Sequence, residues 1–187
     1  MTHPMTHTAQ PALAAPLYSG IALRDATPED VPALMDLLYL KAEFDGAPGA
    51  IRATPEQLAE DLFGDRPLLG VILAEQQGTL VGFATYYRIY SSFLARPGLW
   101  LDDLFLQPSV RGYGLGKAIL QRLCHIAAET GCARIDWTVD IDNAHGIGFY
   151  QAMGAVIDHS VRLCRLDQSA IHAHLPHSAD LPRPAVG

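Results

Sequence analysis

The sequence predicts an α/β protein in which helices lie on the faces of a mixed β-sheet. Short apolar runs of strand length alternate with longer segments whose apolar residues recur every three or four positions, as in an amphipathic helix. The first half contains two adjacent strand-like runs joined by a turn, and the second half has the order strand, helix, strand, helix, strand. Of the 187 residues, 49% are hydrophobic and 18% are charged, which excludes an intrinsically disordered protein.

Two helices are predicted in the first half from their start signals. Residues 27–30, Thr-Pro-Glu-Asp, supply a capping hydroxyl, a proline at the first helical position and acids in the first turn, so a helix should extend to about Phe44. Residues 54–56, Thr-Pro-Glu, repeat this signal, and Gly64 ends the second helix.

Five strands and two further helices complete the predicted order. The strands of the first half form a β-hairpin, because a Gln-Gln-Gly turn at 76–78 separates them. A proline at 108 closes the third strand, and glycines at 131 and 154 end the two later helices. The predicted strands are 69–74, 80–90, 99–106, 134–139 and 156–166, and the predicted helices are 114–130 and 144–153.

The two ends of the chain are predicted to be flexible. Residues 1–20 contain no charged side chain, and three prolines interrupt the apolar run that a secretory signal would need. The segment 167–187 holds histidines at 172, 174 and 177, but no cysteine or carboxylate is spaced with them as a metal ligand set. We therefore predict a leader at 1–20, one domain at 21–166 and a tail at 167–187, with no metal site.

Composition argues against several classes of partner. Acidic residues exceed basic ones by 20 to 13, which argues against non-specific binding to nucleic-acid phosphates. No run approaches the roughly 18 apolar residues of a membrane helix. The three cysteines form no CxxC pair, as is usual for thiols in a reducing compartment. The sequence thus predicts a cytoplasmic protein without nucleic-acid or membrane partners.

The most informative segment is the glycine-rich turn at 111–117, Arg-Gly-Tyr-Gly-Leu-Gly-Lys. It follows an apolar strand and opens an amphipathic helix, so free backbone N–H groups and the positive end of the helix dipole would make it an anion site. The spacing excludes a Walker A loop, which needs a glycine at 111 and a hydroxyl residue at 118, and also the GxGxxG dinucleotide fingerprint. The alternative is that the glycines only shape a tight turn.

Two motifs in the second half resemble those of one enzyme family. Residues 111–116, read as Arg-x-x-Gly-x-Gly, are similar to the (Gln/Arg)-x-x-Gly-x-(Gly/Ala) signature of the GNAT superfamily of acetyl-CoA-dependent N-acetyltransferases. Residues 143–155 resemble that superfamily's later helix, in which Asn precedes Phe-Tyr and Gly-Ala at fixed spacing. The resemblance implies a mixed, mostly antiparallel central sheet flanked by helices on both faces.

A closer resemblance comes from residues 101–105, Leu-Asp-Asp-Leu-Phe, which stand just before the turn. They are similar to the L-E-D-F/L-F of the diamine (spermidine/spermine) acetyltransferases and their thialysine-acetylating relatives. The family's Glu is Asp102 here, one methylene shorter.

The resemblance implies a role for each motif. The turn would hold the pyrophosphate of acetyl-CoA, the co-substrate, and the strand before it would pair with the pantetheine. Tyr150 would protonate the departing sulfur as the general acid, or would instead pack in the core beside Phe149. Asn143 would bond the cofactor, cap a helix, or do both. The implied cofactor-binding residues are Leu104, Phe105, Leu106, Arg111, Gly112, Tyr113, Gly114, Leu115, Gly116, Lys117 and Asn143.

The acceptor amine must lose a proton, and Asp102 is the favoured catalytic carboxylate by resemblance. Asp102 and Asp103 are neighbours on a strand, so their side chains should point to opposite faces and should not form a paired dyad. His125 and His145 are alternatives as the base.

The distribution of charge predicts where a cation would bind. The stretch 24–65 holds ten acidic and three basic residues, and the rest of the chain is balanced. Glu43 and Asp45 stand at the end of the first helix, where the dipole does not favour acids, so with Asp102 they are predicted to bind the substrate.

The resemblance implies an enzyme that moves the acetyl group of acetyl-CoA to an amine, and the acidic stretch favours a small, cationic acceptor, such as a polyamine or an amino-acid-like amine. One alternative is a non-catalytic acyl-CoA sensor that keeps the fold and the turn. A second is acetylation of a protein or peptide amine. The family likeness also implies a homodimer.

Overall fold

The computed structural model describes residues 20–175, which form two compact units that divide after Asp140. Almost all of the predicted leader, and the predicted tail beyond residue 175 with its histidine at 177, lie outside the described residues. The domain boundaries therefore stay predictions.

The first unit contains a five-stranded sheet in the order β1-β2-β3-β4-β5. The first three strand pairs are antiparallel and the last pair, β4 with β5, is parallel, which confirms the mostly antiparallel sheet. Gln77 and Gly78 both have positive φ, as the tight turn of the β2–β3 hairpin requires. The strands are β1 (Ile21–Asp25), β2 (Gly70–Gln76), β3 (Thr79–Ser91), β4 (Arg96–Leu106) and β5 (Ile135–Asp136).

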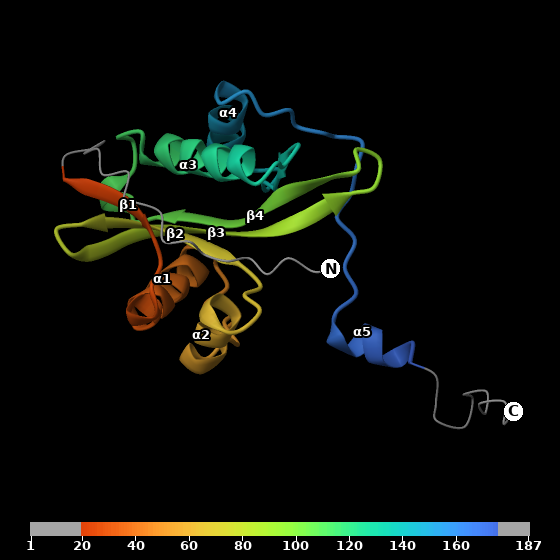
Figure 1. The fold of residues 1–187 in the computed structure, drawn as a ribbon, viewed down its shortest axis with the longest axis horizontal. Coiled ribbons are helices and arrows are strands. Elements are labelled where there is room, and N and C mark those ends of the chain that lie inside the picture. Colours follow the sequence, from red (N-terminus) through yellow and green to blue (C-terminus); the bar gives the residue numbers. More distant parts are fainter. Residues whose placement is uncertain (1–19, 176–187) are drawn as a thin grey trace, which may run out of the picture. The chain divides into compact units, whose positions relative to one another are not determined.

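Helices cover both faces of this sheet (Figure 1). α1 (Val31–Phe44), preceded by a 3-10 turn at Pro28–Asp30, and α2 (Pro55–Phe63) pack on one face, and α3 (Leu115–Glu129) packs on the other. The core under α1 and α2 is built from apolar residues at helical spacing and from alternate strand residues that face them, as expected for amphipathic elements. Its fully or nearly fully buried members are Val31, Leu34, Met35, Leu37, Leu58, Leu62, Val71, Leu73, Leu80, Phe83 and Phe105.

The second unit differs from the prediction in two respects. It contains α4 (Ala144–Ala152), as predicted, but the predicted strand 156–166 is wrong, because this segment has no strand pairing. The side chain of Asp158 accepts bonds from the backbone and hydroxyl of Ser160, and this local turn competes with an extended conformation. A short helix, α5 (Gln168–Ala173), follows, and the side chain of Asp167 caps it by accepting from the N–H of Ala170.

The predicted strand 134–139 is also shorter than expected, since β5 pairs through two residues only. Within residues 20–175 no helix is both long enough and apolar enough to cross a bilayer.

A charged cluster ties the start of α1 to the sheet. Arg24 of β1 donates to both carboxylate oxygens of Asp30, at 2.6 and 2.7 Å, and to Glu75 of β2 at 2.6 Å. Asp30 also accepts from the backbone and hydroxyl of Thr27, which completes a capping box. The bonds from Arg24, followed by those from Thr27, hold the pKa of Asp30 at about 2 although burial opposes them.

We expect Asp30→Asn to lower the free energy of unfolding at pH 7 by about 1 kcal/mol, after allowing for solvent screening of the partly exposed partner. A carboxylate with a lowered pKa stabilises the fold above its ordinary value of 3.8, and this contribution is lost as the pH falls towards 2. Urea unfolding should therefore show a difference from wild type that is full at pH 6–7 and shrinks below about pH 4. Asp36→Asn, on the exposed side of α1, is the control and should change stability little. An unchanged difference at acid pH would contradict the ionic origin.

Candidate active site

Strand β4 carries one more residue than its partner β3 where the two adjacent aspartates lie. Thr85 pairs with Asp103 and Tyr86 pairs with Leu101, so Asp102 has no residue opposite it and forms a β-bulge. A bulge bends its strand and redirects one side chain, and bulges are common next to active sites.

The bulge brings both carboxylates to one face of the sheet, so the prediction that they point to opposite faces is wrong. Asp103 Oδ2 accepts from the hydroxyl of Thr85 at 3.3 Å, and its own N–H donates to that hydroxyl at 3.0 Å. Asp102 Oδ1 accepts from Nε1 of Trp100 at 3.3 Å, and the Trp100 ring lies 6.5 Å from that of Tyr87. Thr85 and Tyr87 stand two residues apart on β3 and therefore share one face.

Lys41 of α1 identifies this face as the one that α1 covers. Its Nζ lies 3.0 Å from Asp103 and 2.5 Å from Asp45. Burial alone would lower the pKa of Lys41, but the hydrogen bonds with Asp45 and Asp103 outweigh it and raise the pKa. Lys41 thus stays charged and neutralises much of the charge on both carboxylates, including the predicted substrate residue Asp45.

Glu43, the other predicted acid of α1, lines an open pocket of about 620 Å³ between α1 and the end of β4. Phe44 and Phe105 form its apolar wall, with ring centroids 6.1 Å apart. Among the described residues no lysine or arginine lies within ion-pair distance of Glu43 or Asp102. These two carboxylates therefore form no ion pair within the described residues, unlike Asp45 and Asp103. The other residues that line the pocket are Leu40, Gln107, Pro108 and Ser109.

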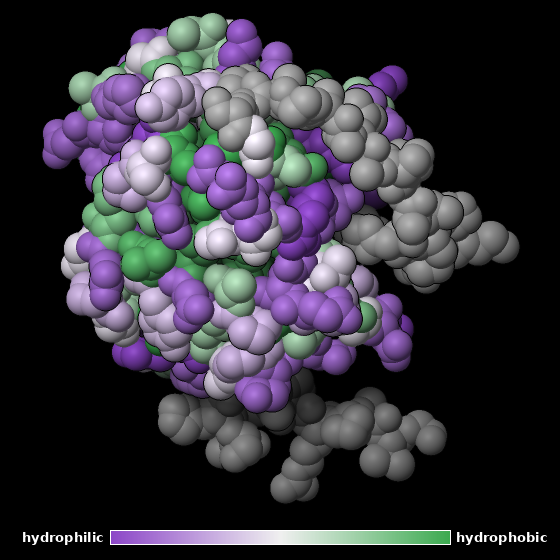
Figure 2. Space-filling model, turned by 90° about the vertical axis from the view of Figure 1, so that its left-hand side faces the viewer, coloured by the Kyte–Doolittle hydropathy of each residue, from purple (hydrophilic) through white to green (hydrophobic). Residues whose placement is uncertain are grey.

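The glycine-rich turn has the geometry of an anion site. Gly112 and Gly114 have φ of +83° and +82°, a conformation that side-chain-bearing residues avoid. Gly114 is the N-cap of α3, and no side chain caps this end, so the first N–H groups of the helix point outward without an intrahelical acceptor. The side chain of Leu115 is buried and anchors the start of α3 in the core. The turn lies at the left-hand end of the sheet in Figure 1, the side that Figure 2 faces, where apolar patches border hydrophilic ones.

Arg111 links this turn to the pocket. Its Nε donates to the carbonyl oxygen of Leu106 at 2.7 Å, which ties the turn to the end of β4. Its guanidinium lies 4.3 Å from the ring centre of Phe44 and 5.8 Å from that of Phe105, within the range of a cation–π contact. The rings hold the charged group at the border between turn and pocket.

Within the described part of the chain, the second half of β4 pairs with β3 on one side and has no neighbouring strand on the other. β5 pairs only with Leu99 and Trp100, so the backbone from 101 to 106 meets no strand on that side. Unpaired N–H and C=O groups on such an edge are available to an extended ligand. Leu104 and Leu106, two predicted cofactor residues, lie on this stretch and are half-buried.

The second unit holds the remaining predicted residues, on α4. Asn143 caps the helix, because its side chain accepts from the N–H of Gly146 at 2.8 Å, so the capping role is observed. Tyr150 and Phe149 have ring centroids 5.2 Å apart, and burial raises the pKa of Tyr150. A phenol with a raised pKa stays protonated at neutral pH, as a proton donor must.

The sequence profile of the Acetyltransferase (GNAT) family matches residues 34–155, about two thirds of the chain. The chain belongs to the GNAT acetyltransferase family. The thialysine N-epsilon-acetyltransferase of Mus musculus is 30% identical over 141 residues, which cover 71% of this chain and 82% of the mouse protein. The L-ornithine N5-acetyltransferase NATA1 of Arabidopsis thaliana is 28% identical over 202 residues, or 84% and 88% of the two chains.

Two further similarities support the branch and the fold. The Homo sapiens spermidine/spermine N(1)-acetyltransferase-like protein 1 is 35% identical over 72% of this chain, although the match covers 20% of the human protein. An aminoglycoside acetyltransferase from an uncultured soil metagenomic sample has a similar fold, with a TM-score of 0.70 at 17% identity over 79% of this chain and 96% of that chain. The GNAT family, its thialysine and diamine branch, the fold and the acetyl-CoA-dependent acyltransferase activity are therefore confirmed.

Sequence reasoning missed several residues of this GNAT site. Lys41, Thr85 and Trp100 contact the two aspartates, and Phe44 supports Arg111, but none belongs to a motif. The one available signal was the helical spacing from Lys41 to Asp45, which is typical of an ion pair. His125, an alternative base, instead lies 3.1 Å from Glu129 on the same helix.

Proposed function

We propose that this GNAT acetyltransferase moves the acetyl group of acetyl-CoA to a primary amine of a small cationic acceptor, a polyamine or an amino-acid-like amine. One observation carries the proposal. Glu43 and Asp102, which have no basic partner among the described residues, both stand beside aromatic rings on the face of the sheet that α1 covers. A carboxylate next to an aromatic surface attracts a cation and accommodates its hydrocarbon chain.

We infer the binding site of the acetyl donor, acetyl-CoA, from the glycine-rich turn and the open edge of β4. The N–H groups from Gly112 to Lys117 would hold the pyrophosphate of acetyl-CoA, with Arg111 at their border. The free edge at 104–106 would pair with the pantetheine and donate to the oxygen of the acetyl carbonyl as its charge grows. The glycines fit this role, because their positive φ and lack of a side chain let the backbone approach an anion closely.

The proposed reaction needs two proton movements. The neutral amine attacks the thioester carbon, so that a C–N bond forms and the C–S bond breaks. The proton of the amine passes to Asp102 directly or through water, and Tyr150 protonates the sulfur of the leaving CoA. Asn143 would bond the donor near its pantetheine arm while it caps α4. The predicted cytoplasmic location, the homodimer and the lack of nucleic-acid, membrane and metal partners stay predictions.

The test is a panel of amines incubated with the full chain and acetyl-CoA, with free CoA measured as a new thiol. We expect polyamines or basic amino acids to release CoA faster than uncharged amines of equal length. If only peptides with free amines release CoA, the acceptor class is wrong. If no amine does, the proposed reaction is wrong. Acceptor binding should also weaken as salt screens the carboxylates.

The ion pair of Lys41 predicts that Glu43 and Asp45 contribute unequally to binding of the amine. Glu43→Gln should raise the KM for the amine about fivefold, because it removes a charge that has no ion-pair partner among the described residues and is worth about 1 kcal/mol. Asp45→Asn, the matched control at the C-cap of the same helix, should change this KM less, because Lys41 already neutralises Asp45. Steady-state kinetics with saturating acetyl-CoA measures both. Equal effects of the two variants would contradict the assignment.

A further inference from the structure

Phe44, the last residue of α1, is an exposed phenylalanine that contacts a charged side chain. It is 61% exposed, so packing in the core explains its position only in part. Its ring lies 6.1 Å from the ring of Phe105, which is buried. The guanidinium carbon of Arg111 lies 4.3 Å from the centre of the Phe44 ring and 5.8 Å from that of Phe105. Phe44 is therefore the nearer of the two aromatic rings that Arg111 contacts.

Arg111 has hydrogen-bonding capacity that the described part of the chain does not use. Its Nε donates to the carbonyl oxygen of Leu106 at 2.7 Å, but no carboxylate within residues 20–175 lies at ion-pair distance from its guanidinium. Within the same residues its Nη groups donate to no acceptor. The N–H groups of a guanidinium match the oxygens of a phosphate, which they can bind through two parallel hydrogen bonds. Arg111 is also the first residue of the glycine-rich turn, the proposed pyrophosphate site.

The ring of Phe44 restricts a side chain that would otherwise be mobile. An arginine at the surface samples many rotamers, and a phosphate that binds it must order them at a cost in entropy. The bond to Leu106 fixes Nε, and the aromatic face attracts the rest of the guanidinium. A guanidinium binds an aromatic ring through its face and a phosphate through the N–H groups at its edge, so the two contacts can coexist.

We propose that Phe44 is a positioning residue for the acetyl donor, whose ring holds the guanidinium of Arg111 ready for the pyrophosphate of acetyl-CoA. The proposal rests on the proposed function and deepens it, since it requires that the glycine-rich turn binds the donor. Phe44 directly follows Glu43, so the end of α1 would act on both substrates. Glu43 would act on the amine, and Phe44 would act on the donor through Arg111. The structural alternative is that the ring only covers Phe105.

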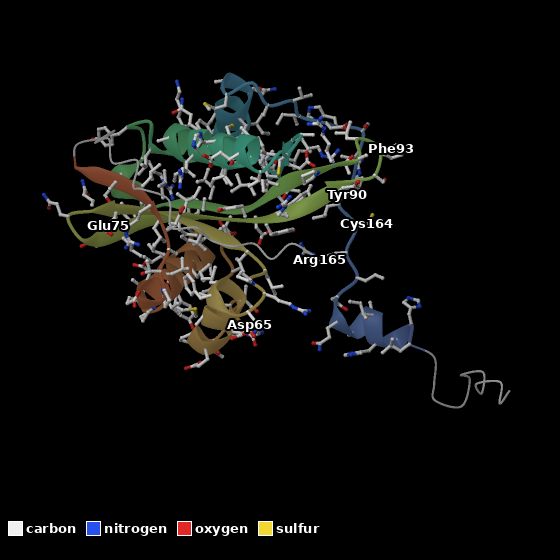
Figure 3. The ribbon with its side chains drawn as sticks, in the orientation of Figure 1. Asp65, Glu75, Tyr90, Phe93, Cys164 and Arg165 are labelled. Atoms are coloured by element: carbon white, nitrogen blue, oxygen red, sulfur yellow. The ribbon has the colours of Figure 1, made fainter. Side chains whose placement is uncertain are left out.

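Calorimetry with the full chain measures the contribution of the ring without turnover. Phe44→Leu should raise the Kd for CoA about fivefold, as expected for loss of a partly exposed cation–π contact, whereas Phe44→Tyr keeps the π-face and should stay within about twofold of wild type. 3′-Dephospho-CoA keeps the pyrophosphate, so Phe44→Leu should weaken its binding by the same factor. Phe93→Leu is the matched control, because Phe93 is fully exposed on the β3–β4 connection, at the end of the sheet away from the turn (Figure 3), and should change neither Kd.

A pair of donors and a double-mutant cycle assign the effect to the pyrophosphate and to Arg111. S-Acetylpantetheine carries the same thioester as acetyl-CoA but no pyrophosphate. When both donors are assayed with one amine, a change in amine binding affects them alike and cancels in the ratio of their kcat/KM values. Phe44→Leu should lower this ratio about fivefold. In an Arg111→Met background it should change the ratio less than about 1.5-fold, because the cation is absent.

Each outcome decides one statement. The positioning role is overturned if Phe44→Leu leaves the Kd and the ratio unchanged, if Phe44→Tyr loses as much as Phe44→Leu, or if the effect persists in the Arg111→Met background. A penalty that disappears with 3′-dephospho-CoA overturns the assignment to the pyrophosphate.

Two further outcomes separate folding and donor binding from the role of the ring. If Phe44→Leu does not fold, as judged by its thermal transition, Phe44→Met replaces it. If neither variant folds, Phe44 is a core residue and its positioning role is overturned. If wild type binds no CoA, the proposed function itself fails. If wild type binds CoA and prefers acetyl-CoA to S-acetylpantetheine but no variant of Phe44 changes either quantity, the proposal about Phe44 is wrong and the proposed function stands.

Discussion

Tyr150→Phe is expected to lower kcat about 100-fold while the Kd for acetyl-CoA stays within twofold. The variant keeps the aromatic ring beside Phe149 and removes only the hydroxyl that would protonate the departing sulfur. General acid catalysis commonly contributes a factor of 10² to 10⁴, and we expect the lower end because CoA is a moderately good leaving group. Measured turnover together with acetyl-CoA binding by calorimetry separates the two quantities.

The pH dependence supplies a second test of Tyr150. Burial raises the pKa of its phenol above the ordinary value of 10, so the decline of wild-type kcat that follows from loss of the phenol's proton should occur at alkaline pH. Tyr150→Phe should lack this decline, because it has no group to ionise there. Tyr39→Phe, at an exposed tyrosine of α1, should leave kcat and its pH profile unchanged. Unchanged turnover in Tyr150→Phe would remove Tyr150 from the catalytic role and favour its packing role.

Gly114→Ala is expected to raise the KM for acetyl-CoA at least tenfold. Gly114 has φ of +82°, where an alanine costs about 1–2 kcal/mol. The first turn of α3 would relax to relieve this strain, and the N–H groups proposed to hold the pyrophosphate would turn away from it. An interaction with several charge-assisted hydrogen bonds loses more than 1.4 kcal/mol when its donors move, which corresponds to a factor of ten.

Gly131→Ala provides the control for strain. Gly131 follows the other end of α3, has φ of +69°, and an added Cβ there would meet no atom within 4 Å. Both variants should lower the free energy of unfolding in urea by similar amounts. Only Gly114→Ala should weaken the binding of acetyl-CoA. Equal KM values in the two variants would mean that the turn shapes the chain without binding the donor. The KM for the amine should change in neither.

The elements with strong local signals could be predicted from the sequence. The start of each early helix is encoded by a capping residue and a proline next to it, and the β2–β3 hairpin by its glycine turn. The anion-binding geometry at 111–117 was predictable for the same reason, since positive φ at glycine and an uncapped helix start are local properties.

The predictions that failed concern features that depend on residues distant in the sequence. The segment 156–166 has the apolar alternation of a strand, yet a strand also needs a neighbour, and no residue within the segment reports one. The bulge at Asp102 arises from the count of residues on β4 relative to β3, which a single strand cannot reveal. Lys41 and Asp103 meet because α1 packs on the face of the sheet that carries Asp103, so neutralisation of Asp45 and Asp103 could not be inferred from charge counts alone.

The bulge also means that β3 and β4 do not need Asp102 to remain in register. Leu101 already pairs with Tyr86 and Asp103 with Thr85, so a chain lacking Asp102 would form an uninterrupted ladder with the same opposite residues and the same buried faces. Asp102, the carboxylate that we propose to act on the acceptor amine, is thus a single-residue insertion that the sheet tolerates, separable from the fold. Chains of this architecture could gain or lose such a carboxylate by a three-nucleotide change, without repacking either side of the sheet.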